Sequence, residues 1–234
     1  MRPLKRVCLL CLCITYMFTC TACGYISNDK NEKIHDDIPA GNIKNVNISS
    51  NARSIVIKQG VTDHFEFYNA DLDEGDQYEV EVAYDEDGSD LDILVTMENA
   101  AAGNDILGSV VVWIPQKEFE CIEIDGEYRQ LSFYTLNSDV VIHANDASVI
   151  MNLMTDELDH NITLAGSESS SFGRVMVYFD QVPENVRIEL NGISQNAIND
   201  PSGFLAGDKG ESGGGEPVIS INSADRIDFY VKEE

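Results

Sequence analysis

Apolar and polar residues alternate in two neighbouring stretches of the chain, as they do in half-buried β-strands. Residues 78–84 read YEVEVAY and residues 91–97 read LDILVTM, so apolar side chains recur at every second position. Between them, residues 85–90 have the composition of a hairpin loop, with Asp87-Gly88 as a favourable turn pair. Further strands are predicted upstream, over residues 46–49, 54–58 and 64–68.

Downstream of Gly108 the pattern becomes a series of short apolar pairs separated by polar turns. Four of these pairs start nine residues apart, at Ile122, Leu131, Val140 and Val149. Less regular pairs follow as far as residue 229. Short strands at this spacing are typical either of a β-solenoid, whose turns stack to share one core, or of a β-sandwich. The loose repetition favours a single all-β, solenoid-like domain, with the β-sandwich as the alternative.

The amino terminus has the composition of an export signal. Arg2, Lys5 and Arg6 form a basic start, and residues 7–18 form a mostly apolar run. That run is too short to span a hydrocarbon core of about 30 Å as a helix. We therefore predict a signal peptide and an extracytoplasmic location.

Small residues precede Cys23, and this segment is similar to the lipobox of bacterial lipoproteins. That resemblance implies cleavage before Cys23 and attachment of lipid, such as palmitate, to its thiol. We expect residues 1–22 to be a lipoprotein signal peptide that leaves the protein anchored to the bacterial cell membrane. Ordinary secretory cleavage near Ala22 is the alternative.

Composition divides the mature chain into a tether and one domain. Residues 24–44 are polar, charged and turn-rich, so residues 23–44 are predicted to be the lipidated cysteine and a flexible tether. Residues 45–234 are predicted to be the β-rich domain. Within it, residues 207–216 contain five glycines and are expected to form a mobile insertion.

The net charge argues against two classes of partner. The chain has 15 Lys and Arg against 41 Asp and Glu, a formal charge of −26 over 234 residues. Such a balance disfavours binding to nucleic acid and to anionic membrane surfaces. With 43% hydrophobic residues, the chain is nevertheless apolar enough to form a folded core.

The cysteines exclude a disulfide scaffold. Four of the six belong to the predicted signal peptide, so lipidation of Cys23 leaves Cys121 as the only free thiol. Cys121 lies in a strand pattern without an activating His or Asn partner in the local sequence. It is interpreted as a small, packed hydrophobic residue.

Two segments resemble a known family. Residues 110–124, VVVWIPQKEFECIEI, contain a strand that ends in a Pro-containing turn and restarts as an alternating strand. Residues 213–229, GGGEPVISINSADRIDF, are similar to the last two strands of the same family, the bacterial putative-adhesin domain. The family's typical Asn-Gly-Asp turn is replaced here by one containing Ser223-Ala224. The resemblance implies a surface-exposed β-repeat domain of a lipoprotein, without an established ligand or activity.

Catalytic and cofactor motifs are missing from the sequence. Phosphate-binding loops, dinucleotide fingerprints and zinc-protease motifs are all lacking, so we expect no enzymatic activity and no cofactor. The remaining metal candidates are Asp85, Asp87, Asp90 and Asp92, whose carboxylates could supply oxygen ligands to calcium. The EF-hand pattern fails, because Asp90 and Thr96 occupy the positions that require Gly and Glu. Solvated turns are the preferred interpretation of these acids.

The sequence therefore predicts a lipid-anchored, extracytoplasmic, adhesin-like or envelope-associated binding protein at the cell surface. Its partners are expected to be the membrane, through the lipid, and an envelope or surface ligand. An enzyme acting on envelope polysaccharide and a structural spacer without a ligand are the two alternatives.

Overall fold

The structure is a computed structural model that describes residues 32–70, 77–98, 108–126, 128–144, 146–166, 171–203, 205 and 215–232. Residues 1–31, which include the predicted signal peptide and Cys23, lie outside these ranges, as does most of the predicted Gly-rich insertion. The described part of the chain is all-β, as predicted. Apart from strands, it contains two short 3₁₀ segments, η2 (Thr155–Glu157) and η3 (Gln195–Ala197).

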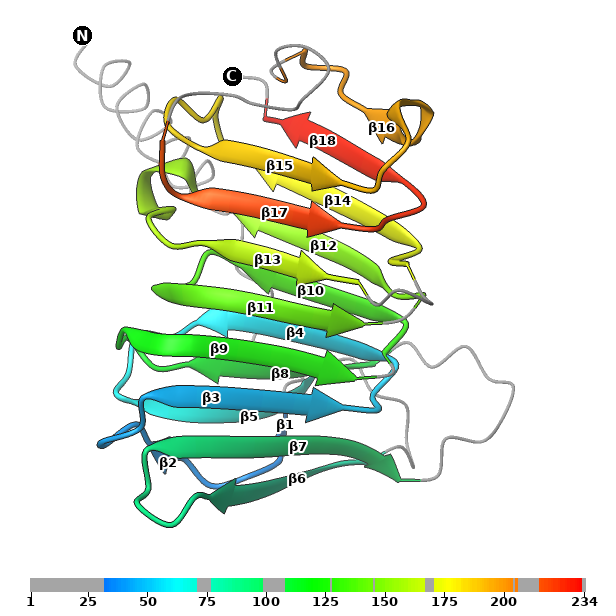
Figure 1. The fold of residues 1–234 in the computed structure, drawn as a ribbon. Coiled ribbons are helices and arrows are strands. Elements are labelled where there is room, and N and C mark those ends of the chain that lie inside the picture. The colour runs from blue at the N-terminus through cyan, green and yellow to red at the C-terminus, as the bar shows by residue number, and fades with distance from the viewer. Residues whose placement is uncertain are drawn as a thin grey trace, which may run out of the picture. The chain divides into compact units, whose positions relative to one another are not determined.

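The strands form two sheets (Figure 1). Sheet I contains, in spatial order, β1 (Glu32–Lys33), β5 (His64–Ala70), β8 (Ser109–Ile114), β4 (Ser54–Gln59), β10 (Gln130–Tyr134), β12 (Ser148–Leu153), β14 (Arg174–Phe179), β18 (Ile227–Val231) and β16 (Ile198–Asn199), with β2 (Ile38–Pro39) also paired to β5. Sheet II contains β15 (Arg187–Asn191), β17 (Val218–Asn222), β13 (Ile162–Ala165), β11 (Ser138–Ala144), β9 (Phe119–Gly126), β3 (Asn45–Ser50), β7 (Asp90–Glu98) and β6 (Gln77–Tyr84).

From β9 to β14 the chain alternates between the two sheets, one strand at a time. Strands β9, β11 and β13 pair in parallel in sheet II, while β10, β12 and β14 pair in parallel in sheet I. Each pair of consecutive strands therefore forms one rung, and the rungs stack in the manner of a solenoid (Figure 1). The nine-residue spacing seen in the sequence is the length of one strand and its turn.

The register of the strands stacks identical positions of successive rungs. In sheet II, Val46, Ile122, Val140, Ile162 and Ile219 lie side by side on five neighbouring strands, and all are buried. Sheet I matches this with its own inward columns, one of which runs through Leu131, Val149, Val175 and Ile227. These columns meet in a single hydrophobic core. A shift of one residue in the pairing would move the apolar side chains of a strand from the core to the solvent. The columns therefore also fix the register.

The order of the rungs departs from the order of the chain at both ends of the stack. The β3–β4 rung lies between β7–β8 and β9–β10, and the β17–β18 rung lies between β13–β14 and β15–β16. At one end the antiparallel strands β6 and β5 cover the edges of β7 and β8. Covering an edge strand in this way protects it from pairing with another molecule.

Residues 32–44 belong to the folded domain, so the expected flexible tether is wrong for this segment. Strands β1 and β2 pair with β5, and Ile38 and Ile43 are buried in the core. The apolar residues in this segment are too few to show a period, which explains why the sequence pattern does not reveal them. The Gly24 to Asn31 part of the predicted tether lies outside the described residues.

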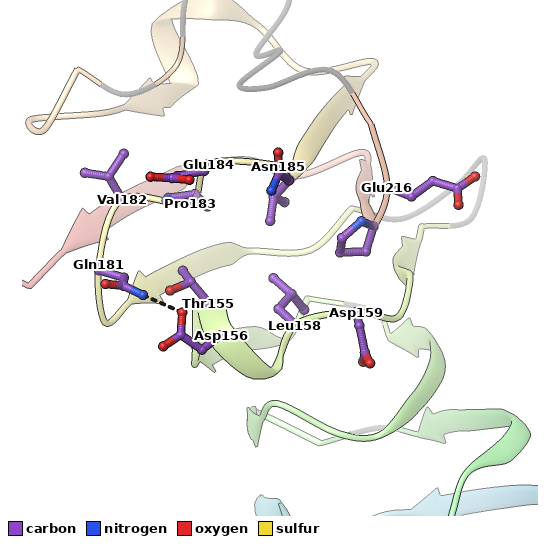
Figure 2. A pocket seen from close by; sticks show the side chains of 12 residues that line it. Thr155, Asp156, Leu158, Asp159, Gln181, Val182, Pro183, Glu184, Asn185 and Glu216 are labelled. Atoms are coloured by element: carbon purple, nitrogen blue, oxygen red, sulfur yellow. Dashed lines mark hydrogen bonds between the residues drawn. The ribbon is translucent and has the colours of Figure 1, made fainter.

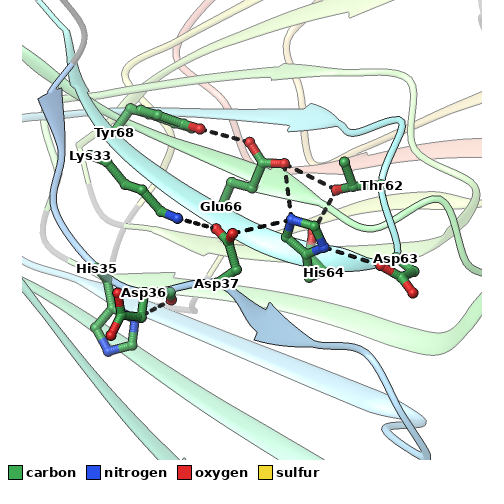
Figure 3. Close-up of polar contacts among 9 residues, drawn as sticks. All are labelled: Lys33, His35, Asp36, Asp37, Thr62, Asp63, His64, Glu66 and Tyr68. Atoms are coloured by element: carbon green, nitrogen blue, oxygen red, sulfur yellow. Dashed lines mark hydrogen bonds and ion pairs between the residues drawn. The ribbon is translucent and has the colours of Figure 1, made fainter.

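A cluster of polar side chains holds the same segment against β5 (Figure 3). His64 Nε2 lies 3.3 Å from an Asp37 oxygen and 3.4 Å from a Glu66 oxygen. Lys33 Nζ lies 2.6 Å from Asp37, and the Tyr68 hydroxyl donates to Glu66 at 2.9 Å. Burial and this bond to Glu66 raise the pKa of Tyr68 to about 12. The cluster thus joins the start of the described chain to sheet I.

The turn between β17 and β18 contains a serine in the left-handed region. Ser223 has a φ of +66°, the left-handed region in which glycine is favoured. Its backbone is held on both sides, because Ser223 N donates to Asn191 O and Phe172 N donates to Ser223 O. These two bonds hold the serine in a conformation that is unusual for a residue with a side chain.

Candidate functional site

The outer faces of the two sheets differ in charge. The outward positions of sheet II and its hairpin carry many carboxylates, namely Glu79, Glu81, Asp90, Asp92, Glu123, Asp125, Asp139 and Glu189. The outward positions of the parallel strands of sheet I carry one, Asp228. The carboxylates of the outer faces therefore concentrate on sheet II, and the parallel strands of sheet I are nearly neutral.

A row of large side chains crosses the outer face of sheet I, one from each strand. In spatial order from β8 to β18, the row consists of Trp113, Lys58, Tyr134, Asn152, Tyr178 and Tyr230. Tyr134 and Tyr178 are 37% and 38% exposed, which is unusual for large hydrophobic side chains of this domain. The flat parallel sheet positions them at matching heights on adjacent strands.

Side chains along this row contact one another everywhere except at Asn152. Lys58 Nζ lies 5.4 Å from the centroid of the Trp113 ring and 4.8 Å from that of Tyr134, so the ammonium group fills the space between the two rings. Tyr178 and Tyr230 stack, with centroids 4.8 Å apart and an interplanar angle of 14°. Between Tyr134 and Tyr178 stands only the short Asn152.

A pocket of about 430 Å³ opens at that point. Its walls include Tyr134, Tyr178 and Tyr230, and its far end is formed by residues that follow the strands, Met154, Asp180 and Lys232. Within the described part of the chain, the Asn152 side chain makes no hydrogen bond. We call this feature the Asn152 slot: the pocket between the Tyr134 and Tyr178 rings with Asn152 at its base.

Beside the row, Asp228 ties three strands together on the same face. Arg174 Nε and Arg226 Nη2 donate to its carboxylate at 2.7 and 2.8 Å, and Asn199 Nδ2 donates at 2.8 Å. Asp228 is fully buried. Burial alone would raise the pKa of this carboxyl, but the bonds from Arg226, Arg174 and Asn199 outweigh it and lower the pKa to about 2. The one carboxylate on the parallel strands of sheet I is therefore neutralised by its neighbours.

A second pocket, of about 470 Å³, is lined by loops through which the chain passes from sheet I to sheet II (Figure 2). It is lined by loop residues that directly follow Met154 and Asp180 of the slot. Its acidic side chains are Asp156, Asp159, Glu184 and Glu216. Gln181 donates to Asp156 at 2.8 Å, and in Figure 2 no two of these four carboxylates point toward each other. A paired-carboxylate site therefore has no support in this pocket.

The four predicted calcium candidates lie close together but bind the protein itself. Asp85 accepts from the Asp90 backbone N–H at 2.9 Å, and Asp87 accepts from that of Ser89 at 3.0 Å. Asp90 and Asp92 accept from Asn45 and Asn47 on the neighbouring strand, both at 2.8 Å. Within the described ranges, no three His, Cys, Asp or Glu side chains are grouped to hold a metal ion. The acids close the predicted β6–β7 hairpin and join it to β3.

Two cysteines are the remaining candidate residues of the sequence. Cys121 is half-buried at an outward position of sheet II, and its interpretation as a small, packed hydrophobic residue stays a prediction. Partial burial, Glu123 and Asp139 raise the pKa of its thiol, which keeps it protonated. Cys23 lies outside the described residues, and none of the helices that the structure describes is long and apolar enough to cross a bilayer.

The aromatic row has a signal in the sequence that appears when short segments are aligned. SVVVW (109–113), QLSFY (130–134) and RVMVY (174–178) share apolar residues at their second and fourth positions and an aromatic residue at the fifth. Residues 226–230, RIDFY, repeat this pattern, and residues 148–152, SVIMN, break it with Asn152. This pattern lies at the outward positions of the strands. A search for apolar residues at every second position considers only the inward positions and therefore misses it.

Comparisons with known proteins establish the fold. No family model matches the chain, and no curated protein matches it. The chain is similar to a solved structure described as a putative cell adhesion protein from Clostridium sporogenes ATCC 15579, with a TM-score of 0.55 and 14% identity. The alignment covers 88% of this chain and 99% of that one. At this identity the likeness shows a shared fold.

Proposed function

We propose that this protein is an adhesin-like binding module at the cell surface, lipid-anchored through Cys23 on the extracytoplasmic side of a bacterial membrane. We further propose that it binds its ligand through the outer face of sheet I. The observation that carries this proposal is the contrast between an acidic outer face of sheet II and a nearly neutral, aromatic outer face of sheet I.

Electrostatics favour the outer face of sheet I as the contact surface. A chain with a formal charge of −26 is repelled by other acidic surfaces, and the repulsion is strongest where its carboxylates concentrate. Exposed tyrosine and tryptophan side chains contribute most of the energy at many binding interfaces. Charge and side-chain type therefore favour the same strands, β8 to β18.

The class of function is supported by the similar solved structure. Its description as a cell adhesion protein applies to that protein, and the present chain shares its fold over most of its length. The adhesin-like resemblance of residues 110–124 and 213–229 agrees with it. The described residues of these segments lie in β8, β9, β17 and β18 and in the turns by which the chain passes from one sheet to the other.

Replacement of Cys23 by alanine is expected to abolish lipid anchoring. Two or three acyl chains on one cysteine retain a protein firmly at a membrane, whereas their loss releases it. Radiolabelled palmitate should enter the wild-type chain and the control variant Cys121→Ala, and it should be absent from Cys23→Ala. Equal labelling of all three proteins would show that Cys23 is not the site.

An arginine placed on the outer face of sheet I is expected to block adhesion. Ser132 lies at the middle of this face on β10, and Thr163 lies at the matching outward position of sheet II on β13. Bacterial cells that display the full chain are tested for retention on immobilised bacterial envelopes and on animal extracellular matrix. Ser132→Arg should lower retention about tenfold, while Thr163→Arg should leave it unchanged.

Two results would contradict this proposal, and a third would favour one of its alternatives. Equal losses in Ser132→Arg and Thr163→Arg would place the binding surface elsewhere. If wild-type cells are retained no better than cells without the protein, the domain acts as a spacer. Release of reducing sugar from either surface would favour the enzyme alternative.

A further inference from the structure

We infer that the Asn152 slot binds one sugar ring of a glycan, held between the faces of Tyr134 and Tyr178. This inference rests on the proposed function, because it names the ligand class for the outer face of sheet I. The observation that supports this inference is the gap at Asn152, between large side chains that contact one another on either side of it.

The neighbouring positions of the row show how such a space is filled. The space between Trp113 and Tyr134 is occupied by the Lys58 ammonium group, 5.4 and 4.8 Å from the two ring centroids. Tyr230 packs directly on Tyr178. On β12 the equivalent side chain is Asn152, which is too short to reach between rings, and the pocket of about 430 Å³ opens there.

The width of the slot suits a single ring. Strands β10 and β14 are separated by β12, and two strand spacings amount to roughly 9.6 Å. A ring placed midway would lie about 4.8 Å from each tyrosine. That is the distance at which Tyr178 and Tyr230 already stack. A ligand ring would therefore continue the row with the spacing that the protein itself uses.

The chemistry of the slot favours a sugar over a purely apolar ligand. A pyranose ring has C–H groups on its faces, which meet the negative faces of the tyrosine rings, and hydroxyl groups at its edge. The Asn152 amide offers donors and an acceptor at the base of the slot. Asp180 and Lys232 add charged groups at its end. An aromatic side chain or an acyl chain would cover the amide without bonding to it, which is costly.

The most informative variant fills the slot with the protein's own side chain. Asn152→Tyr is expected to complete the row from Tyr134 to Tyr230, so the domain should fold with an unchanged or higher melting temperature. The same change should abolish glycan binding, because the ligand ring and the new side chain compete for one space. A loss of binding in this variant therefore cannot be attributed to unfolding.

The test uses the mature chain with Cys23→Ala on a printed array of bacterial and animal glycans. Wild type should bind at least one glycan. Tyr178→Ala should weaken that binding about tenfold, and Tyr178→Phe, which keeps the ring, should retain it within about twofold. Tyr84→Ala is the matched control, because Tyr84 is 53% exposed on β6 of sheet II.

The outcomes separate this inference from the proposed function. If no glycan binds, or if Asn152→Tyr binds as well as wild type, the inference is overturned. The proposed function survives such a result when Ser132→Arg still lowers adhesion to a target that protease treatment destroys. Adhesion that periodate oxidation of the target removes, and protease does not, supports both.

Discussion

Replacement of Gly126 by alanine is expected to destabilise the domain severely. Gly126 ends β9 with a φ of +152°, between Ser50 of β3 and Ala144 of β11. A Cβ at this position would lie 2.0 Å from the Ser50 carbonyl oxygen, a backbone atom that cannot rotate away. The two strands would have to separate, which breaks the register of neighbouring rungs.

The expected loss for Gly126→Ala is about 4 kcal/mol of unfolding free energy, the sum of an unfavourable φ and overpacking against backbone. Gly192→Ala is the control, because Gly192 has a φ of +69° but open space around its Cβ position. This variant should lose only about 1 kcal/mol. Urea denaturation of both variants measures the difference, and equal losses would contradict the close approach of β3 and β9.

Removal of the Asp228 carboxylate is expected to cost about 3 kcal/mol. Its two oxygens accept from Arg174, Arg226 and Asn199 on three neighbouring segments of sheet I, and the residue is fully buried. In Asp228→Ala, the two guanidinium groups would face each other without a counter-charge. Because both arginines are partly exposed, water compensates for some of this loss. Asp228→Asn should retain the shape and lose the charge.

The pH dependence of this contribution follows from the lowered pKa. Asp228 has a pKa of about 2 in the folded chain and an ordinary value near 3.8 when unfolded. The ionised carboxylate therefore stabilises the fold above pH 3.8, and this contribution is lost as the pH falls through about 2. The difference in unfolding free energy between wild type and Asp228→Asn should shrink over that interval. A constant difference from pH 7 to pH 2 would contradict the assignment.

The strands are largely predictable because most of their inward positions are apolar. Ile122 and Ile124 alternate with the acidic residue Glu123, Val175 and Val177 recur at the same spacing, and each pair lies in a strand of the observed fold. The stacking order is not predictable. Whether β3–β4 lies first or second in the stack does not change the local pattern of either strand, so only pairing in three dimensions decides it.

The candidate site is hard to predict from the sequence because it also depends on how distant strands pair. Trp113, Tyr134, Tyr178 and Tyr230 are separated by up to 117 residues in the sequence and meet only through the register of sheet I. The conspicuous chemical signal in the sequence is the run of acids around residue 87, whose carboxylates bond to backbone N–H groups in a hairpin. Residues 32–44 show no strand pattern because their contribution to the core comes from isolated side chains such as those of Ile38 and Ile43.

The outer face of sheet I is the proposed binding surface, and its solvent accessibility in the bound state tests the proposal directly. Hydroxyl-radical footprinting compares the mature chain free in solution with the chain bound to the surface that retains it. We predict that oxidation of Tyr134 and Tyr178 falls several-fold on binding, while Tyr84 on sheet II reacts as before. Protection of Tyr84 with unchanged reactivity of Tyr134 and Tyr178 would contradict this assignment.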